Sequence, residues 1–390
     1  MLSNGFAQKA VVASAAVLLL SGCMESMPKL ADASTNTDSL RPEAAQSSEP
    51  TKPRFVIPLF NADTVQQLRG QTTSVQRDAR CEQSVVPGVT GNIAGLITLM
   101  AQTEVKNQVA SLPSLFNRAA PSVPQTNAWA SVKIAARYLT WLPLPIEEKI
   151  GKYKHEQYDD LLSRESRQGR RLYPDLDQKL SQLLSGVTDP HDYTFKVFIR
   201  KRSQDNAVAS PGGFLYIDEG LFDSQSGKLT PDGLFALAHE VSHVLQRHET
   251  YNIQSRILDS VEGLQQATTL INGIQRGDDQ VVANLMQLFA KTRNQFGRFY
   301  ADQELHADNC ALRLLSQSSL SDAEMSGAVA RFEERVRHLP DHADDHKHDF
   351  ITIVNRPIDR HPGGSLRMMN LRESNDFWMK RRPGRANSVK

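Results

Sequence analysis

The sequence predicts an α+β fold that is mainly helical, with a small sheet beside one central helix. Three observations support this class. From about residue 141 onward, apolar residues recur mostly at helical spacing, while a few short runs rich in Val, Ile, Tyr and Phe read as strands. A hydrophobic content of 39% with a charged content of 23% suits a globular body. The net charge of +1 gives no support for nucleic-acid binding or electrostatic attachment to a membrane.

The first residues have the features of an export signal. Ala10–Leu20 is a run of 11 residues that is apolar except for Ser14, too short to span a bilayer and typical of a signal-peptide core. Leu20-Ser21-Gly22-Cys23 follows directly and resembles the bacterial lipobox, in which the cysteine is lipidated. An ordinary secretion signal with a chance cysteine is the alternative. Because Met24 and not aspartate follows the cysteine, the resemblance favours an outer-membrane anchor that faces the periplasm.

The cysteine count suggests one disulfide. The chain has three cysteines. If Cys23 carries lipid, Cys81 and Cys310 remain in an oxidising compartment, where we predict that they pair. Two buried free thiols are the alternative, and the sequence leaves this open.

The first predicted elements are two helices and a set of short strands. Helical periodicity covers Pro145–Leu162 and Leu176–Leu184. Tyr193–Ile199 alternates between apolar and polar residues, as a strand does. Asn206–Ser210 and Phe214–Asp218 flank Pro211-Gly212-Gly213, and this arrangement predicts a hairpin.

The central helix is predicted to begin after Thr230. Thr230 is a good N-cap, Pro231 suits the first helical position and Asp232 complements the helix dipole. We expect this helix to run to about Ile253. Residues 260–298 are predicted to be mostly helical around a turn at 277–279, and a further helix is expected over about 298–317.

The central helix carries His239-Glu240-Val241-Ser242-His243, an H-E-x-x-H motif. Two histidines four residues apart lie on one face of a helix, so both imidazoles can bind one zinc ion. Zinc lowers the pKa of its bound water to about 7, and Glu240 would take the proton of that water and pass it to the leaving amine. The alternative is a surface helix with two coincidental histidines.

A catalytic zinc needs a third protein ligand. A metzincin would have glycine at position 246 and histidine at 249, but this chain has Gln246 and Glu249. His248 lies about 180° around a continuous helix from His239 and would be a surface residue or an outer partner. Glu304 is the better candidate. Asp308, one helical turn further on, can accept a hydrogen bond from the free N–H of a ligand histidine.

These motifs resemble a known family. H-E-x-x-H followed far downstream by E-x-x-A-D is similar to the gluzincin metallopeptidases that include HtpX and the type I CaaX prenyl protease. The segments Glu147–Gly151, Asn206–Gly213 and Glu219–Leu221 also resemble that family, as does His361-Pro362 with Arg367. The nearest subgroup is that of the periplasmic β-barrel-assembly-enhancing protease and its lipoprotein relatives. The family often has arginine at position 301 and glycine at 311, where this chain has alanine.

The resemblance implies a zincin-like metallopeptidase with one zinc per chain. It also implies roles near the metal for His361, which can approach the open zinc position, and for Arg367, which could hold the loop or the oxyanion. The substrate is predicted to add as a strand along 206–218, with Asn206, Gly212 and Gly213 on that strand. Misfolded or misassembled envelope proteins are the expected substrates. A non-catalytic assembly factor or chaperone that retains the fold and zinc is the alternative.

We therefore divide the chain into five parts: a lipoprotein signal peptide (1–22), a flexible tether (23–53), a region of unknown role (54–140), the metallopeptidase domain (141–375) and a basic tail (376–390). Four histidines between His338 and His348 form either a second metal site or, as we favour, a polar loop. His306 is interpreted as structural.

Overall fold

The computed structural model describes residues 80–86, 140–259, 261, 264–292, 301–341 and 363–382. These residues are mainly helical and include a three-stranded sheet, so the predicted α+β class is confirmed. Within these ranges, no helix is both long and apolar enough to cross a bilayer.

The sheet has the order β1-β3-β2, with β1 at Lys196–Arg200, β2 at Ala207–Ser210 and β3 at Phe214–Asp218. β1 runs parallel to β3, and β2 runs antiparallel to it. The predicted hairpin is therefore present, and it leaves β2 at an edge of the sheet. Its turn needs glycine because Gly212 and Gly213 have φ angles of 74° and 85°, in the left-handed region.

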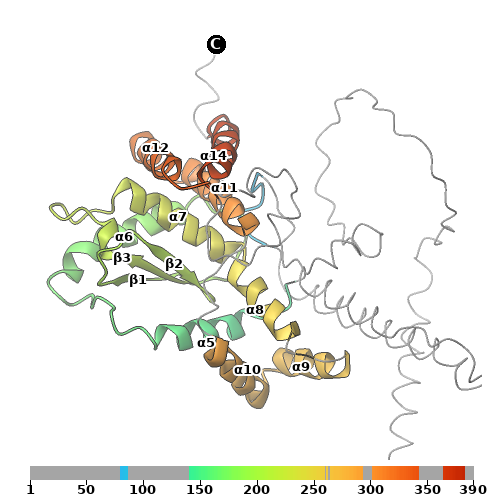
Figure 1. Cartoon of the computed structure of the whole chain (residues 1–390). Coiled ribbons are helices and arrows are strands. Elements are labelled where there is room, and N and C mark those ends of the chain that lie inside the picture. The colour runs from blue at the N-terminus through green and yellow to red at the C-terminus, as the bar shows by residue number, and fades with distance from the viewer. Residues whose placement is uncertain are drawn as a thin grey trace, which may run out of the picture. The chain divides into compact units, whose positions relative to one another are not determined.

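Helix α7 spans Pro231–Leu245 and lies at the centre of the described fold. Thr230 caps it as predicted, since its side-chain oxygen accepts a hydrogen bond of 3.1 Å from the backbone N–H of Gly233. One side of α7 packs on β2 and β3. The other side packs on α11 (Ala301–Gln317) and α12 (Asp322–Arg337), while α14 (Gly364–Met379) packs on both of these helices (Figure 1).

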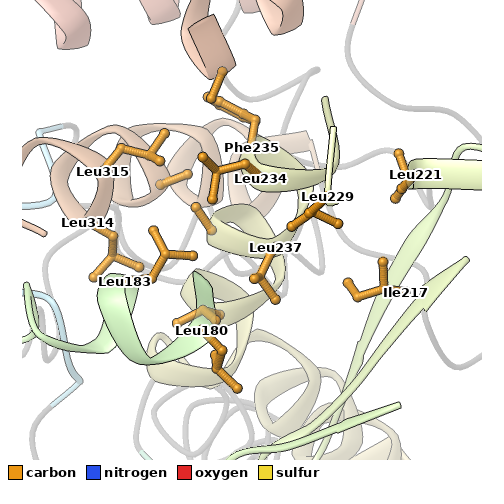
Figure 2. Close-up of a cluster of buried hydrophobic side chains, with 14 of the residues drawn as sticks. Leu180, Leu183, Ile217, Leu221, Leu229, Leu234, Phe235, Leu237, Leu314 and Leu315 are labelled. Carbon is orange, nitrogen blue, oxygen red and sulfur yellow. The ribbon is translucent and has the colours of Figure 1, made fainter. Parts of the chain in front are cut away.

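The main hydrophobic core joins the sheet to the helices around α7. Figure 2 shows leucines of α6 (Gly169–Leu184) pointing toward leucines of α7 and α11, with Ile217 of β3 nearby. A second core lies around α5 (Leu144–His155), α8 (His248–Asp259), α9 (Leu264–Arg276) and α10 (Asp279–Thr292). A short 3-10 turn, Glu219–Leu221, follows β3. The core residues of α7 all belong to the first core, and the second core contains none of them.

Several helix boundaries differ from the sequence prediction. The helix predicted over Pro145–Leu162 ends at His155, and Leu161 instead forms a single bridge with Arg200 next to β1. The helix predicted to reach Ile253 stops at Leu245, because Arg247 takes a φ of 54° before α8 begins. The turn at Gly277 between α9 and α10 is present. Helix α14 runs to Met379, four residues past the predicted domain end.

Residues 80–86 contact the C-terminal ends of α7 and α14 and the middle of α11. Cys81 and Cys310 form the predicted disulfide, which joins positions 229 residues apart. The indole N–H of Trp378 donates to the carbonyl of Arg80 at 2.9 Å, and the guanidinium of Arg313 donates to the carbonyl of Cys81 at 3.1 Å. This short segment is therefore fixed to the back of α11, the helix that supplies Glu304.

Candidate metal centre

Three side chains converge between α7 and α11. Nε2 of His239 lies 2.9 Å from Nε2 of His243. The carboxylate oxygens of Glu304 lie 3.5 Å from the first of these nitrogens and 3.7 Å from the second. All three side chains are buried, and their ligand atoms lie within 4.8 Å of one another. The structure therefore brings together the three ligands that the sequence predicts.

This donor set fits zinc. Ligand atoms on a tetrahedral zinc ion, with bonds of about 2.0–2.1 Å, are separated by about 3.3 Å. The three observed separations lie close to that value on both sides. Two imidazole nitrogens and one carboxylate are a ligand set of catalytic zinc sites, and three protein ligands leave a fourth position for water or substrate.

Asp308 lies directly behind His239. Its Oδ1 is 2.9 Å from Nδ1 of His239, so the ring presents its other nitrogen, Nε2, to the metal position. The guanidinium of Arg367 donates two hydrogen bonds to the same carboxylate, one of 2.9 Å from Nε and one of 2.6 Å from Nη2. A buried chain from α14 through α11 to α7 thus fixes the orientation of a ligand.

The charges of Arg367, Asp308 and His239 affect one another. Burial would raise the pKa of Asp308, but the charge of Arg367 and the contact with His239 hold it below its usual range. Burial would lower the pKa of His239, yet the contacts with Asp308 and Glu304 outweigh it and raise this pKa to about 10. The two carboxylates that contact His239 therefore favour a positive charge on its side of the site.

Glu240 faces the edge strand of the sheet. Its Oε2 accepts a hydrogen bond of 2.6 Å from the backbone N–H of Ala209 in β2. The carboxylate is buried and stands next to the ligand His239 in the chain. The bond from Ala209 thus fixes the Glu240 carboxylate at the edge strand, and its place in the motif suits a general base for water.

Residues 171–375, just over half of the chain, match peptidase family M48. The chain belongs to peptidase family M48. It is a zinc metalloendopeptidase. The group formed by His239, His243 and Glu304 could hold the metal. No curated protein matches the chain.

The other predicted site residues of this M48 peptidase are placed as follows. Arg367 contacts Asp308, so the structure gives it a positioning role, and a direct role at the substrate oxyanion stays a prediction. His361 lies outside the described residues, and its role also stays a prediction. Gly212 and Gly213 form the turn beyond β2, and a Cβ at Gly212 would lie 2.5 Å from Cα of Glu148. Close packing thus explains the need for glycine there.

Two histidines that were not predicted to be ligands lie next to the candidate metal centre. Nδ1 of His248 is 2.8 Å from Nδ1 of His243, and Nε2 of His248 is 3.3 Å from Nδ1 of His306. Burial, together with the neighbouring imidazoles of His243 and His306, lowers the pKa of His248 well below its ordinary value. The prediction placed His248 with a continuous helix, and the break at Arg247 makes that geometry wrong.

A second group of possible ligands consists of Cys81, His306 and Cys310. Its two sulfur atoms are bonded to each other in the disulfide, so they are not metal ligands in this structure. Of the predicted histidine-rich stretch, only His338 lies within the described residues, as the C-cap of α12.

Removing the charge of Arg367 or of Asp308 should separate stability from metal binding. Arg367→Gln leaves a buried carboxylate without its ion-pair partner, and we expect a loss of about 3–5 kcal/mol in the free energy of unfolding. In the double variant with Asp308→Asn, part of that stability should return because position 308 no longer carries a buried carboxylate without a partner. Zinc affinity should stay about 10–100-fold weaker, because His239 has lost its carboxylate partner.

Urea unfolding of the metal-free protein and competition with a zinc chelator measure the two effects. Equal zinc affinity in the double variant and the wild type would show that Asp308 does not position His239.

Proposed function

We propose that this zinc endopeptidase is anchored in the envelope of a Gram-negative cell and cleaves misfolded or misassembled envelope proteins. The observation that carries the substrate class is the outer edge of β2 beside Glu240, with which no other strand of the described residues pairs. The lipobox-like Cys23 and the Cys81–Cys310 disulfide, which suits an oxidising compartment, support the location.

The register of the hairpin shows which backbone groups face outward. The carbonyl of Asn206 accepts a hydrogen bond of 2.9 Å from the N–H of Asp218, so Asn206 and Val208 point their backbone groups toward β3. Ala207 and Ala209 then point away from β3, in agreement with the bond from Ala209 to Glu240. An added strand would therefore pair with the backbone of Ala207 and the carbonyl of Ala209.

Strand addition recognises the backbone of a substrate more than its side chains. A folded protein rarely offers an extended segment without a partner, whereas a misfolded chain does. A protease that binds substrate in this way would have broad sequence specificity and would select for lack of structure.

The residues of the site have distinct tasks in hydrolysis. His239, His243 and Glu304 would hold zinc, which would polarise the scissile carbonyl and make water easier to deprotonate near neutral pH. Glu240 would take a proton from the attacking water and pass it to the leaving amine, while the N–H of Ala209 holds its carboxylate beside the proposed substrate strand. Asp308, with Arg367 behind it, keeps Nε2 of His239 directed at the metal.

Glu240→Gln should separate metal binding from catalysis. We expect one zinc per chain and an unchanged melting temperature, because the amide keeps the size of the side chain and Glu240 is not a ligand. Cleavage of unfolded casein should fall by about 10²–10⁴-fold, the usual contribution of a general base. Cleavage at the wild-type rate would exclude Glu240 as the base, and metal chelation of the wild type is the matching control for zinc dependence.

Proline at position 207 should impair substrate binding without breaking the hairpin. Ala207→Pro removes an N–H that points away from β3, so we expect unchanged stability and a loss of about 2–10-fold in kcat/KM, from one missing hydrogen bond. Val208→Pro is the matched control, because it removes an N–H that points toward β3 and should destabilise the protein. If Ala207→Pro cleaves casein as well as the wild type, the substrate does not pair with this edge.

Lipid attachment at Cys23 can be tested independently of activity. We expect Cys23→Ala to move the protein from the membrane fraction to the soluble fraction, because the acyl chains supply the membrane affinity. Cell fractionation measures the distribution, and mass spectrometry of the N-terminal peptide measures the lipid. A variant that remains in the outer-membrane fraction would show that another feature attaches the protein.

A further inference from the structure

Three buried histidines form a row that starts at the metal centre. His243 is on α7, His248 is the first residue of α8 and His306 is on α11. The nitrogen contacts are 2.8 Å between His243 and His248 and 3.3 Å between His248 and His306. His248 has no exposed surface at all, so its side chain serves the interior of the protein.

The backbone is bent in a way that places His248 in this row. In an uninterrupted helix, a residue five positions after His243 would lie roughly 140° further around the axis and would face elsewhere. Here α7 ends at Leu245, and Arg247 adopts a φ of 54°, which is uncommon for a residue with a side chain. The chain then turns, and His248 points back at His243.

Several contacts hold this bend. The guanidinium of Arg247 binds the carboxylate of Glu147 and donates a hydrogen bond of 2.6 Å to the carbonyl of Leu142. The side-chain amide of Gln303, on α11, donates to the carbonyl of His248 at 3.3 Å. Two other parts of the chain, residues 142–147 and α11, thus keep His248 in its place.

The two ligand histidines differ in the group behind them. A histidine that binds metal through Nε2 carries its proton on Nδ1, and that N–H needs an acceptor. For His239 the acceptor is the carboxylate of Asp308. For His243 the atom at hydrogen-bond distance is Nδ1 of His248. It can accept only if His248 carries its own proton on Nε2, the nitrogen that faces His306.

We propose that His248 is a positioning residue of the zinc site. Its Nδ1 accepts a hydrogen bond from the Nδ1–H of His243, and its own Nε2–H donates to Nδ1 of His306. Nε2 of His243 is thereby directed at the metal. This inference rests on the zinc assignment and not on the proposed substrate.

Charge explains why an imidazole suits this place. The carboxylates of Glu240 and Glu304 balance the charge of a zinc ion, and Arg367 balances Asp308. A carboxylate in place of His248 would add a buried negative charge that the described groups around it do not compensate. A neutral imidazole supplies an acceptor without that cost.

Two amide variants of His248 test the proposal. In His248→Asn, the side-chain oxygen can occupy the place of Nδ1 and accept from His243. In His248→Gln, the oxygen lies further out, near the place of Nε2, and faces His306. We expect the asparagine variant to bind zinc within about 3-fold of the wild type and the glutamine variant to bind it about 10–100-fold more weakly, the usual effect of losing the outer partner of a ligand.

Zinc affinity is measured on the full chain by competition with a chromophoric chelator, together with the melting temperature of the metal-free protein. The visible spectrum of bound Co²⁺ reports the ligand geometry and should change more in the glutamine variant. If both variants lose affinity equally, His248 only fills space. If neither loses affinity, it does not position His243. Either result overturns the proposal.

Discussion

The packing of α7 against α11 is the constraint on which the rest of the site depends. The two ligands on α7 cannot bind a metal without Glu304, which comes from α11. The same helix supplies Asp308, which lies between His239 and Arg367. A shift of α11 by one residue along its axis would move both carboxylates away from the imidazoles. The buried ion pair to α14 and the disulfide at Cys310 oppose such a shift, so these two features serve the metal even though neither touches it.

The two ligand histidines are held by different chemistry, and this affects the whole centre. His239 is backed by a carboxylate that already has a cation, while His243 is backed by a neutral imidazole. The arrangement holds both rings without adding net charge to a buried site. The arrangement requires a positive φ angle at Arg247, which is unfavourable for a residue with a side chain. The fold tolerates it because that side chain binds Glu147 and the carbonyl of Leu142. Local strain at a functional site is then compensated by contacts around it.

The sequence predicted the parts of the site that have a local signature, such as helical spacing or a turn motif. His239, His243, Glu304 and Asp308 obey helical spacing, and the hairpin was visible from its Pro-Gly-Gly turn. The sequence offered two places for His248, on the surface or behind a ligand, and the structure shows the second. The continuous helix assumed for that prediction was wrong, because helices that end in a left-handed residue usually have glycine or asparagine there and this chain has arginine. The partner of Arg367 could not be foreseen, since it depends on how α14 packs on α11. Such contacts are tertiary and leave no local pattern.

The bond between Glu240 and Ala209 connects the two halves of the mechanism. The backbone N–H of Ala209 in the edge strand donates to the base. The backbone groups of Ala207 and the carbonyl of Ala209 also point away from β3, where a substrate could pair with them. In the proposed pairing, the distance from the base to the scissile bond would be set by the register of β2. A substrate that pairs with β2 is aligned with the base by the pairing itself. Side-chain pockets are not needed for that alignment, and this is why the geometry suits a protease whose substrates share only their lack of structure.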